Sequence, residues 1–108
     1  MLKTIQVHED EEKLLGDILN EYDRQIALRR AGKFWYTCED SPGLSPSLKL
    51  GVLMEEVGEV ARAILNMNGS ANDMTIKEAE VNLRTELVQV AAVAFAWLKG
   101  IENDTTKT

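Results

Sequence analysis

Apolar residues recur at intervals of three and four positions in three segments of this chain, and this spacing predicts three amphipathic helices. The segments cover residues 9–31, 46–67 and 75–99. Nowhere do apolar and polar residues alternate in steps of two over a strand-like length, so no strand is expected. The predicted fold class is therefore all-α.

Residues at the segment ends favour these boundaries. The acidic run at 9–12 suits a helix start, because carboxylates are stabilised by the positive end of the helix dipole. Ser45 and Thr75 are suitable N-caps for the second and third helices. Gly32 follows the first segment and Gly100 the third, and glycine is common just past a helix end. We therefore expect the third helix to stop at Gly100.

The chain is expected to form one domain over residues 1–108, with a lead-in at 1–8 and a flexible tail at 103–108. The linker between the second and third helices is short, so these two helices should pack antiparallel. The run from Val90 to Leu98 is apolar on almost all sides, which is typical of a helix buried all round. Three helices do not easily surround one of their own number. We therefore expect an antiparallel helical bundle completed by oligomerisation, as a homodimer or a homotetramer.

Two glycines lie inside the second predicted helix. Gly51 and Gly58 share one face of it, because seven residues are close to two helical turns. Each costs about 1 kcal/mol relative to alanine in a helix interior. We interpret the glycine face as a place where another backbone or a ligand comes close.

The composition argues against some classes of partner. A formal net charge of −6 disfavours a nucleic acid polymer, which needs a basic surface, but leaves open a small phosphorylated ligand held through a metal ion. No run approaches the apolar length of a membrane span, and the first residues contain no apolar core of signal-peptide length. Cys38 is the only cysteine, so an intrachain disulfide is impossible and a cytoplasmic location is expected.

The second predicted helix carries three carboxylates within an apolar pattern. Glu55, Glu56 and Glu59 fall within roughly one third of the helix circumference. Like charges at this spacing repel each other, and the repulsion grows when they are partly buried. Either solvent with nearby basic residues or a divalent cation must compensate for it.

A second acidic position lies in the third predicted helix. Glu86 precedes the apolar run, and Gln89 follows three residues later on the same side. Antiparallel packing can bring both opposite Glu56 and Glu59. Oxygen ligands of this kind suit Mg²⁺ or Mn²⁺. The alternative is a solvated acidic face with Arg62 and Arg84 as counterions, although the apolar surroundings of Glu86 favour the metal.

Three consecutive aromatic residues, Phe34, Trp35 and Tyr36, fall in the predicted loop after the first helix. One interpretation is a loop held over the core by aromatic packing. The other is a stacking surface for a flat ligand such as a nucleobase. Their clustering in a loop, rather than at helical spacing, favours the second interpretation.

Two segments, EEVGEVARAIL and LRTELVQVAAVAFAWLKGIE, resemble the MazG-like all-α nucleotide pyrophosphohydrolases, especially their small single-domain members from phage and bacteria. The motif of that family is Glu-Glu-x-x-Glu, a variable spacer and Glu-x-x-Asp. Its first half is complete here, and its second half has Glu86 with Gln89 in the aspartate position. The segment 21–25, EYDRQ, and Trp35 also look like the N-terminal part of these proteins. The resemblance covers about residues 18–102.

The resemblance implies Mg²⁺-dependent hydrolysis of a nucleoside triphosphate between the α and β phosphates, giving a monophosphate and pyrophosphate, and a role in cleansing the nucleotide pool. It implies that Glu55 orients or deprotonates the attacking water. It also implies contacts of Gln25 and Trp35 with the base and of Lys49 with a phosphate. The implied metal ligands are Glu56, Glu59, Glu86 and, in the fourth position, Gln89.

Gln89 departs from the family motif. An amide supplies a neutral oxygen, so the site has one negative charge fewer and is expected to hold further metal ions less tightly. Gln89 would alternatively hydrogen-bond Glu86 and hold it in position. Two alternatives to the enzyme therefore stay open: a catalytically weak nucleotide- or metal-binding module, and a structural helical dimerisation domain.

Overall fold

The computed structural model describes residues 7–32, 38–39, 44–67 and 75–106, and within these residues it contains three helices and no strand. Helix α1 is Glu9–Arg30, α2 is Pro46–Met67 and α3 is Ile76–Thr106. The prediction of an all-α fold is confirmed for this part of the chain.

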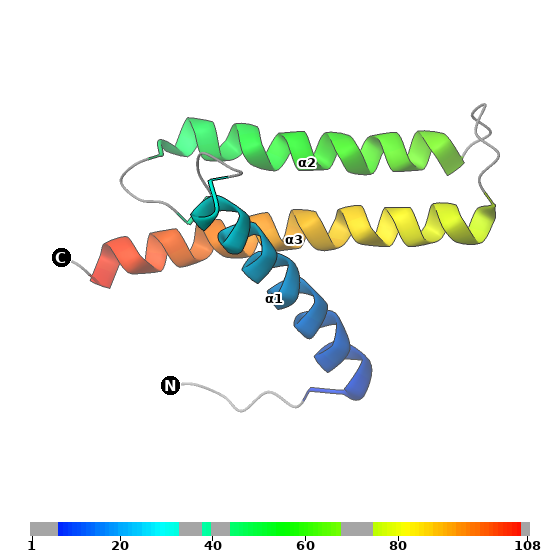
Figure 1. Ribbon diagram of the computed structural model, residues 1–108, viewed down its shortest axis with the longest axis horizontal. Coiled ribbons are helices and arrows are strands. Elements are labelled where there is room, and N and C mark those ends of the chain that lie inside the picture. Colours follow the sequence, from blue (N-terminus) through cyan, green and yellow to red (C-terminus); the bar gives the residue numbers. More distant parts are fainter. Residues whose placement is uncertain (1–6, 33–37, 40–43, 68–74, 107–108) are drawn as a thin grey trace.

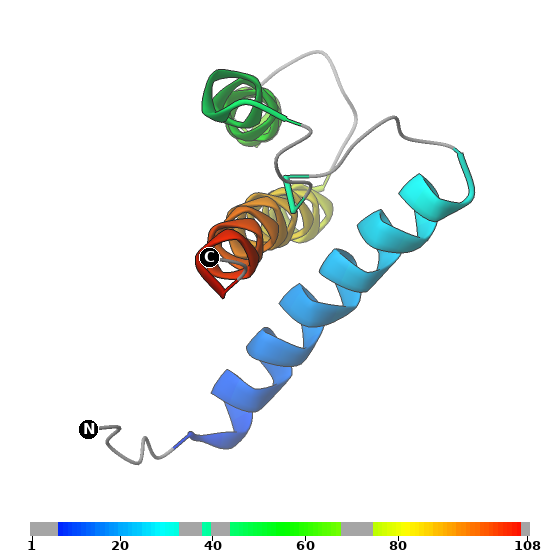
Figure 2. The ribbon, with the colours of Figure 1, turned by 90° about the vertical axis from the view of Figure 1, so that its left-hand side faces the viewer.

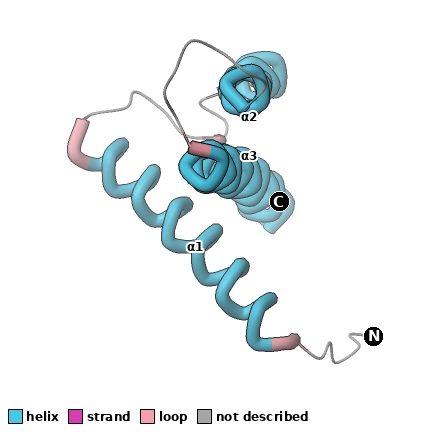
Figure 3. Tube along the Cα trace, turned by 90° about the vertical axis from the view of Figure 1, so that its right-hand side faces the viewer, coloured by secondary structure: helices cyan, strands magenta, loops and turns pink. Residues whose placement is uncertain are grey.

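Helix α3 is the central element. Helices α2 and α3 lie side by side and run in opposite directions, and α1 crosses α3 obliquely (Figure 1). The view along α3 shows α1 and α2 on different sides of it (Figure 2). Within the described helices α3 packs against both others, whereas α1 and α2 are not in contact (Figure 3). The expected antiparallel packing of the second and third helices is therefore present.

Capping residues set three helix ends as predicted. The backbone N–H of Leu48 donates to the Ser45 hydroxyl at 3.3 Å, and the N–H of Glu78 donates to the Thr75 hydroxyl at 3.1 Å. Both bonds satisfy amide groups that have no partner in the first turn of a helix. Helix α1 ends before Gly32, whose φ of 79° lies in the left-handed region that glycine adopts without strain.

The predicted end of the third helix is wrong. Helix α3 continues through Gly100 to Thr106, so residues 103–106 of the expected flexible tail are helical. Gly100 instead makes room for the Cys38–Glu39 turn. An alanine Cβ at this position would lie 2.8 Å from the Glu39 backbone oxygen and 3.1 Å from that of Cys38. The glycine serves close approach of a backbone, which is a different use from helix termination.

The core lies where α1 and the Cys38–Glu39 turn meet the second half of α3. Its buried members are Tyr22, Cys38, Ala92, Val93 and Ala96. Partly buried apolar side chains pack around them: Ile18, Ile26, Val52, Leu53, Phe95 and Trp97. Every helix therefore contributes to one small core.

Tyr22 is the main link between α1 and the rest of the chain. Its hydroxyl donates a hydrogen bond of 2.7 Å to Glu39 Oε2, and its ring meets that of Phe95 edge-on at 5.1 Å. Lys99 Nζ lies 3.8 Å from Glu39 Oε1 and 5.0 Å from the centre of the Tyr22 ring. Burial, followed by the Glu39 carboxylate, raises the pKa of Tyr22. The hydrogen-bonded cluster joins α1, the turn and α3.

The apolar run from Val90 to Leu98 is covered differently from the expectation. Ala92, Val93 and Ala96 are buried within the single chain, because α1 and α2 cover α3 from two sides. This run therefore does not by itself require a partner subunit. The expected homodimer or homotetramer stays a prediction that needs another basis.

One helix in the described part of the chain, Ile76–Asn103 of α3, is long and apolar enough to cross a membrane by length and composition, at a mean hydropathy of 1.2. A single such helix is weak evidence for a membrane span, since core helices pass the same test.

Candidate functional site

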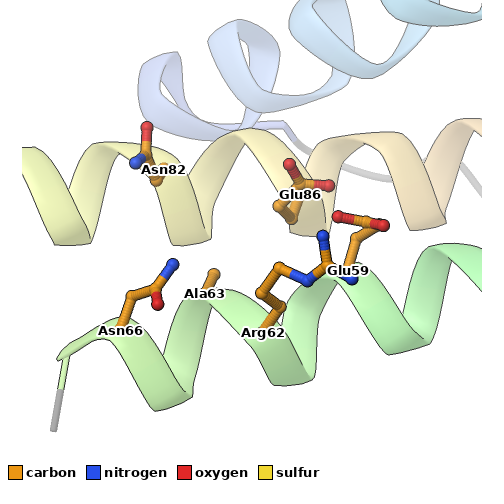
Figure 4. A pocket seen from close by; sticks show the side chains of 6 residues that line it. All are labelled: Glu59, Arg62, Ala63, Asn66, Asn82 and Glu86. Carbon is orange, nitrogen blue, oxygen red and sulfur yellow. The ribbon is translucent and has the colours of Figure 1, made fainter. Parts of the chain in front are cut away.

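Helices α2 and α3 enclose a polar cavity of about 200 Å³ between them. Glu59 of α2 and Glu86 of α3 lie at one end, and Asn66 and Asn82 lie at the other (Figure 4). Its lining residues are Glu59, Arg62, Ala63, Asn66, Asn82 and Glu86. The antiparallel packing therefore brings two of the predicted metal ligands together.

Glu86 is the most unusual group in this cavity. Its Oε2 atom is buried and has no hydrogen-bond partner among the described residues. A buried carboxylate oxygen without a partner costs several kcal/mol when the group is charged, unless a cation or a proton compensates. The Arg62 guanidinium points toward Glu59 and Glu86 in the same cavity (Figure 4), as the alternative of basic counterions requires, but it does not hydrogen-bond to this oxygen.

Glu56 shares this environment. Burial raises its pKa above the ordinary value, and repulsion from Glu86, Glu55, Glu59 and Glu21 raises it further. Glu56 and Glu59 are partly buried, whereas Glu55 is exposed. The predicted ligands on α2, Glu56 and Glu59, therefore face α3. Glu55 lies at the surface, and its charge helps to raise the pKa of Glu56.

Gln89 lies one turn along α3 from Glu86 and is partly buried. Because α2 and α3 are antiparallel and Glu59 faces Glu86, three residues toward the start of α2 correspond to three residues toward the end of α3. Gln89 is therefore level with Glu56. Glu59 and Glu86 therefore line the contact, Glu56 interacts electrostatically with Glu86, and Gln89 lies at the height of Glu56 along the helix pair.

Helix α1 adds residues that the sequence did not indicate as part of the site. Glu21 accepts two hydrogen bonds from Arg24, at 2.8 and 2.7 Å, and a third from Gln25 Nε2 at 3.1 Å. Glu21 and Arg24 both interact electrostatically with Glu56. The spacing of three and four residues within EYDRQ predicts the hydrogen bonds of Arg24 and Gln25 to Glu21. It does not predict that Glu21 interacts electrostatically with Glu56 of α2. Gln25, predicted to contact a base, donates its hydrogen bond to Glu21 from α1.

A second cavity of about 270 Å³ lies between α1 and α3. Arg84 donates a hydrogen bond of 2.8 Å to Asp17 across the two helices. Lys13 donates to the same oxygen of Asp17 at 3.0 Å, and the pKa of Asp17 is lowered by Arg84 and then by Lys13. The lining residues are Asp17, Asn20, Glu21, Arg24, Arg84, Thr85 and Val88. Arg84 is thus an α1 partner, which differs from the alternative in which it balances the α2 carboxylates.

Two further predicted residues lie away from the acidic group. Lys49 is buried, at 4% exposure, and precedes Glu56 by two turns of α2, about 10 Å along the axis. Its backbone oxygen accepts a hydrogen bond from the buried Cys38 thiol at 3.8 Å. Trp35, with Phe34 and Tyr36, lies outside the described residues.

The site as it stands is a carboxylate-rich contact between helices. Among the described residues, no three His, Cys, Asp or Glu side chains are grouped closely enough to hold a metal ion in their present positions. Comparison of the chain with protein-family models, with curated proteins and with solved structures gives no match.

Proposed function

We propose that this protein is a Mg²⁺-dependent nucleoside triphosphate pyrophosphohydrolase of the MazG-like kind, which releases a monophosphate and pyrophosphate. The observation that carries the proposal is the buried, unpartnered Oε2 of Glu86 facing Glu59. A divalent cation bound between the helices would offset both the negative charge at this oxygen and the carboxylate repulsion that contributes to the raised pKa of Glu56.

The residues present fit such a cation. Glu56, Glu59 and Glu86 supply charged oxygens, and Gln89 supplies a neutral one, which is a ligand set for Mg²⁺ or Mn²⁺. A bound ion of this kind neutralises phosphate charge and lowers the pKa of a coordinated water. The chain contains one histidine and one cysteine, so a zinc centre has little support.

Four further side chains have proposed roles in acting on the water and in binding the nucleotide. Glu55 is proposed to orient the attacking water or remove its proton, and its exposure leaves it open to solvent. Gln25 and Trp35 are proposed to contact the base, and Lys49 a phosphate. Of these residues, Gln25 is the best supported. It donates a hydrogen bond to Glu21, and Glu21 interacts electrostatically with Glu56.

The proposal is tested by incubating the full chain with the common nucleoside triphosphates and Mg²⁺ or Mn²⁺ and measuring pyrophosphate. We expect release from at least one nucleotide. Glu56→Gln and Glu86→Gln should each lower kcat/KM by at least about 100-fold. Each replaces a charged metal ligand by a neutral side chain of similar shape. Glu80→Gln, an exposed position on α3, is the matched control and should change little.

Intact nucleotides under all these conditions would refute the enzyme. A reaction that survives both substitutions unchanged would place the chemistry elsewhere in the chain. Separation of the products also identifies the bond that is cut, since cleavage between the β and γ phosphates gives a diphosphate and inorganic phosphate instead.

Gln89 favours a second candidate, a nucleotide- or metal-binding module that turns over slowly or not at all. Its neutral oxygen replaces the carboxylate of the family motif on a partly buried position. Calorimetric binding of a nucleotide with Mg²⁺, without pyrophosphate release, would support this candidate. Gln89→Asp then restores the full set of carboxylates and is expected to restore turnover.

We further propose that the protein works in the cytoplasm and forms a homodimer or a homotetramer. Support for self-association comes from the large apolar side chains that are exposed on all three helices. Sedimentation velocity tests it.

A further inference from the structure

The outer face of α2 is apolar. Leu50, Met54, Val57 and Ile64 have exposed fractions of 50, 56, 40 and 43%, and Ala61 between them is exposed as well. These five residues, which we call the outer seam of α2, lie on one side of the helix at 100° per residue. The seam points away from α3, because Glu56, Glu59 and Ala63 lie on the opposite side.

Helix α2 therefore has apolar residues on both sides. Its inner side carries carboxylates together with Val52 and Leu53, which pack against the core, and its outer side carries exposed aliphatic side chains. An amphipathic helix on the surface of a monomer turns its polar side to water. An apolar outer side is explained when a second apolar surface covers the outer seam.

The spacing of the seam matches a helical partner. Its positions follow intervals of four, three, four and three residues, which is the heptad pattern of two helices packed along one another. Within the described helices α1 does not contact α2, and its N-terminal half runs away from it (Figure 2). The described part of the same chain thus leaves the seam uncovered.

The two glycines of α2 border the seam. A Cβ at Gly51 or at Gly58 would meet nothing within 4 Å. Nothing in the described chain therefore requires glycine at either place, although each weakens the helix. Close approach of a second backbone supplies the missing reason.

We propose that the outer seam of α2 binds the same seam of a second copy of this chain, with the two α2 helices antiparallel. A two-fold axis near Gly58 then places the glycine-bearing flanks of both helices against each other. Glu55 and Arg62 are exposed, seven residues apart, on that flank. The same axis brings Glu55 level with Arg62 of the partner subunit, twice, so the charges of the two surfaces are complementary.

This inference rests on the oligomeric part of the proposed function and deepens it. It is argued mainly from exposure and spacing on the outer face, whereas the reaction rests on Glu56, Glu59 and Glu86 of the inner face; Glu55 and Arg62 border both. A protein that associates without hydrolysing nucleotides would refute the enzyme alone. A hydrolase that stays monomeric would refute the interface alone.

The test is sedimentation velocity on the full chain over a concentration series. The wild type is expected to associate, and Met54→Glu and Val57→Glu should each weaken association by at least about tenfold, because each places a charge in an apolar contact. Val81→Glu is the matched control, since Val81 is 55% exposed on α3 and lies outside the seam. Helical circular dichroism verifies that each variant is folded.

Two further variants give results that a merely destabilised chain would not. Gly58→Ala should raise the thermal stability of the dilute monomer, because the methyl group meets nothing in the chain, and yet weaken association. Glu55→Arg should weaken association, and the double variant Glu55→Arg/Arg62→Glu should restore it. A wild type that is monomeric, seam variants that associate like the wild type, or Val81→Glu weakening association equally would each overturn the proposal.

Discussion

Gly100 shows how one residue decides the position of a loop. The Cys38–Glu39 backbone lies against it, and both carbonyl oxygens occupy the space that a side chain would take. The same turn holds Glu39, which binds Tyr22 and contacts Lys99. The position of Glu39, and with it one of the contacts between α1 and α3, therefore depends on the absence of a Cβ at Gly100.

We predict that Gly100→Ala lowers the free energy of unfolding by about 1 to 3 kcal/mol, since an added methyl group in a packed site forces the backbone to shift. Urea unfolding followed by circular dichroism measures this change. Gly16→Ala is the control, because a Cβ at Gly16 in α1 meets nothing within 4 Å. It should instead add up to about 1 kcal/mol. A Gly100→Ala variant as stable as Gly16→Ala would contradict the packing described here.

Sequence predicts local residue roles here better than distant ones. Ser45, Thr75 and Gly32 act within one helical turn of their own positions, so their capping roles follow from the neighbouring letters. A local pattern does not distinguish Gly100 from a helix-ending glycine, but the residues it contacts, Cys38 and Glu39, are about sixty positions away in the sequence. Glu21 was missed for a similar reason, because only the crossing of α1 over α3 brings it near Glu56.

Helix α1 depends on few contacts. It packs against α3 alone among the helices, through Tyr22 in the core and the Asp17–Arg84 ion pair at the surface. A surface pair of this kind contributes at most about 1 kcal/mol. The Tyr22 hydroxyl, bonded to Glu39 in a partly buried position, is therefore the more important polar anchor.

We predict that Tyr22→Phe weakens the attachment of α1 by about 1 to 2 kcal/mol, because it removes the hydroxyl hydrogen bond and keeps the ring contact with Phe95. Hydrogen exchange measures the effect helix by helix. Amides of α1 should exchange faster than in the wild type, while those in the contact between α2 and α3 should change little. Lys13→Ala is the control, since it removes an exposed pair within α1. Equal acceleration in all three helices would contradict this view.

At the scale of elements, periodicity predicted the existence and nearly all the bounds of the helices. It also predicted the antiparallel α2–α3 packing, because a short linker leaves little choice. The pattern also indicated that Glu56 and Glu59 can face the third helix, but it did not predict that the opposite, apolar side of α2 is exposed within the chain. An apolar stripe indicates that a face is covered, but the stripe does not specify whether the cover belongs to the same chain.

In the whole protein, the carboxylate-rich contact between α2 and α3 makes stability depend on pH. The raised pKa of Glu56 means that the folded chain binds more protons than the unfolded chain between the ordinary value of 4.5 and the raised one. Stability from this group is therefore lost as the pH rises through that interval. A cation bound at neutral pH opposes the loss, because it binds the folded state.

We predict that, without divalent ions, Glu56→Gln is more stable than the wild type, and that its advantage grows as the pH rises from about 4.5 and then levels off. Urea unfolding at several pH values measures the difference. Mg²⁺ should stabilise the wild type more than the variant, which lacks one ligand charge. Glu80→Gln should follow the wild type throughout. An unchanged difference with and without Mg²⁺ would favour a structural domain over a metal site.

The apolar outer side of α2 has a consequence for how the chain tolerates substitutions. A helix on the surface of a monomer usually has a stripe of positions where most substitutions are accepted, and this stripe repeats with the helical period. In α2 the inner stripe carries the carboxylates and the outer stripe carries the seam, so only narrow flanks are free. Systematic substitution along α2 should therefore show two sensitive stripes on opposite sides, and a small number of permissive positions between them.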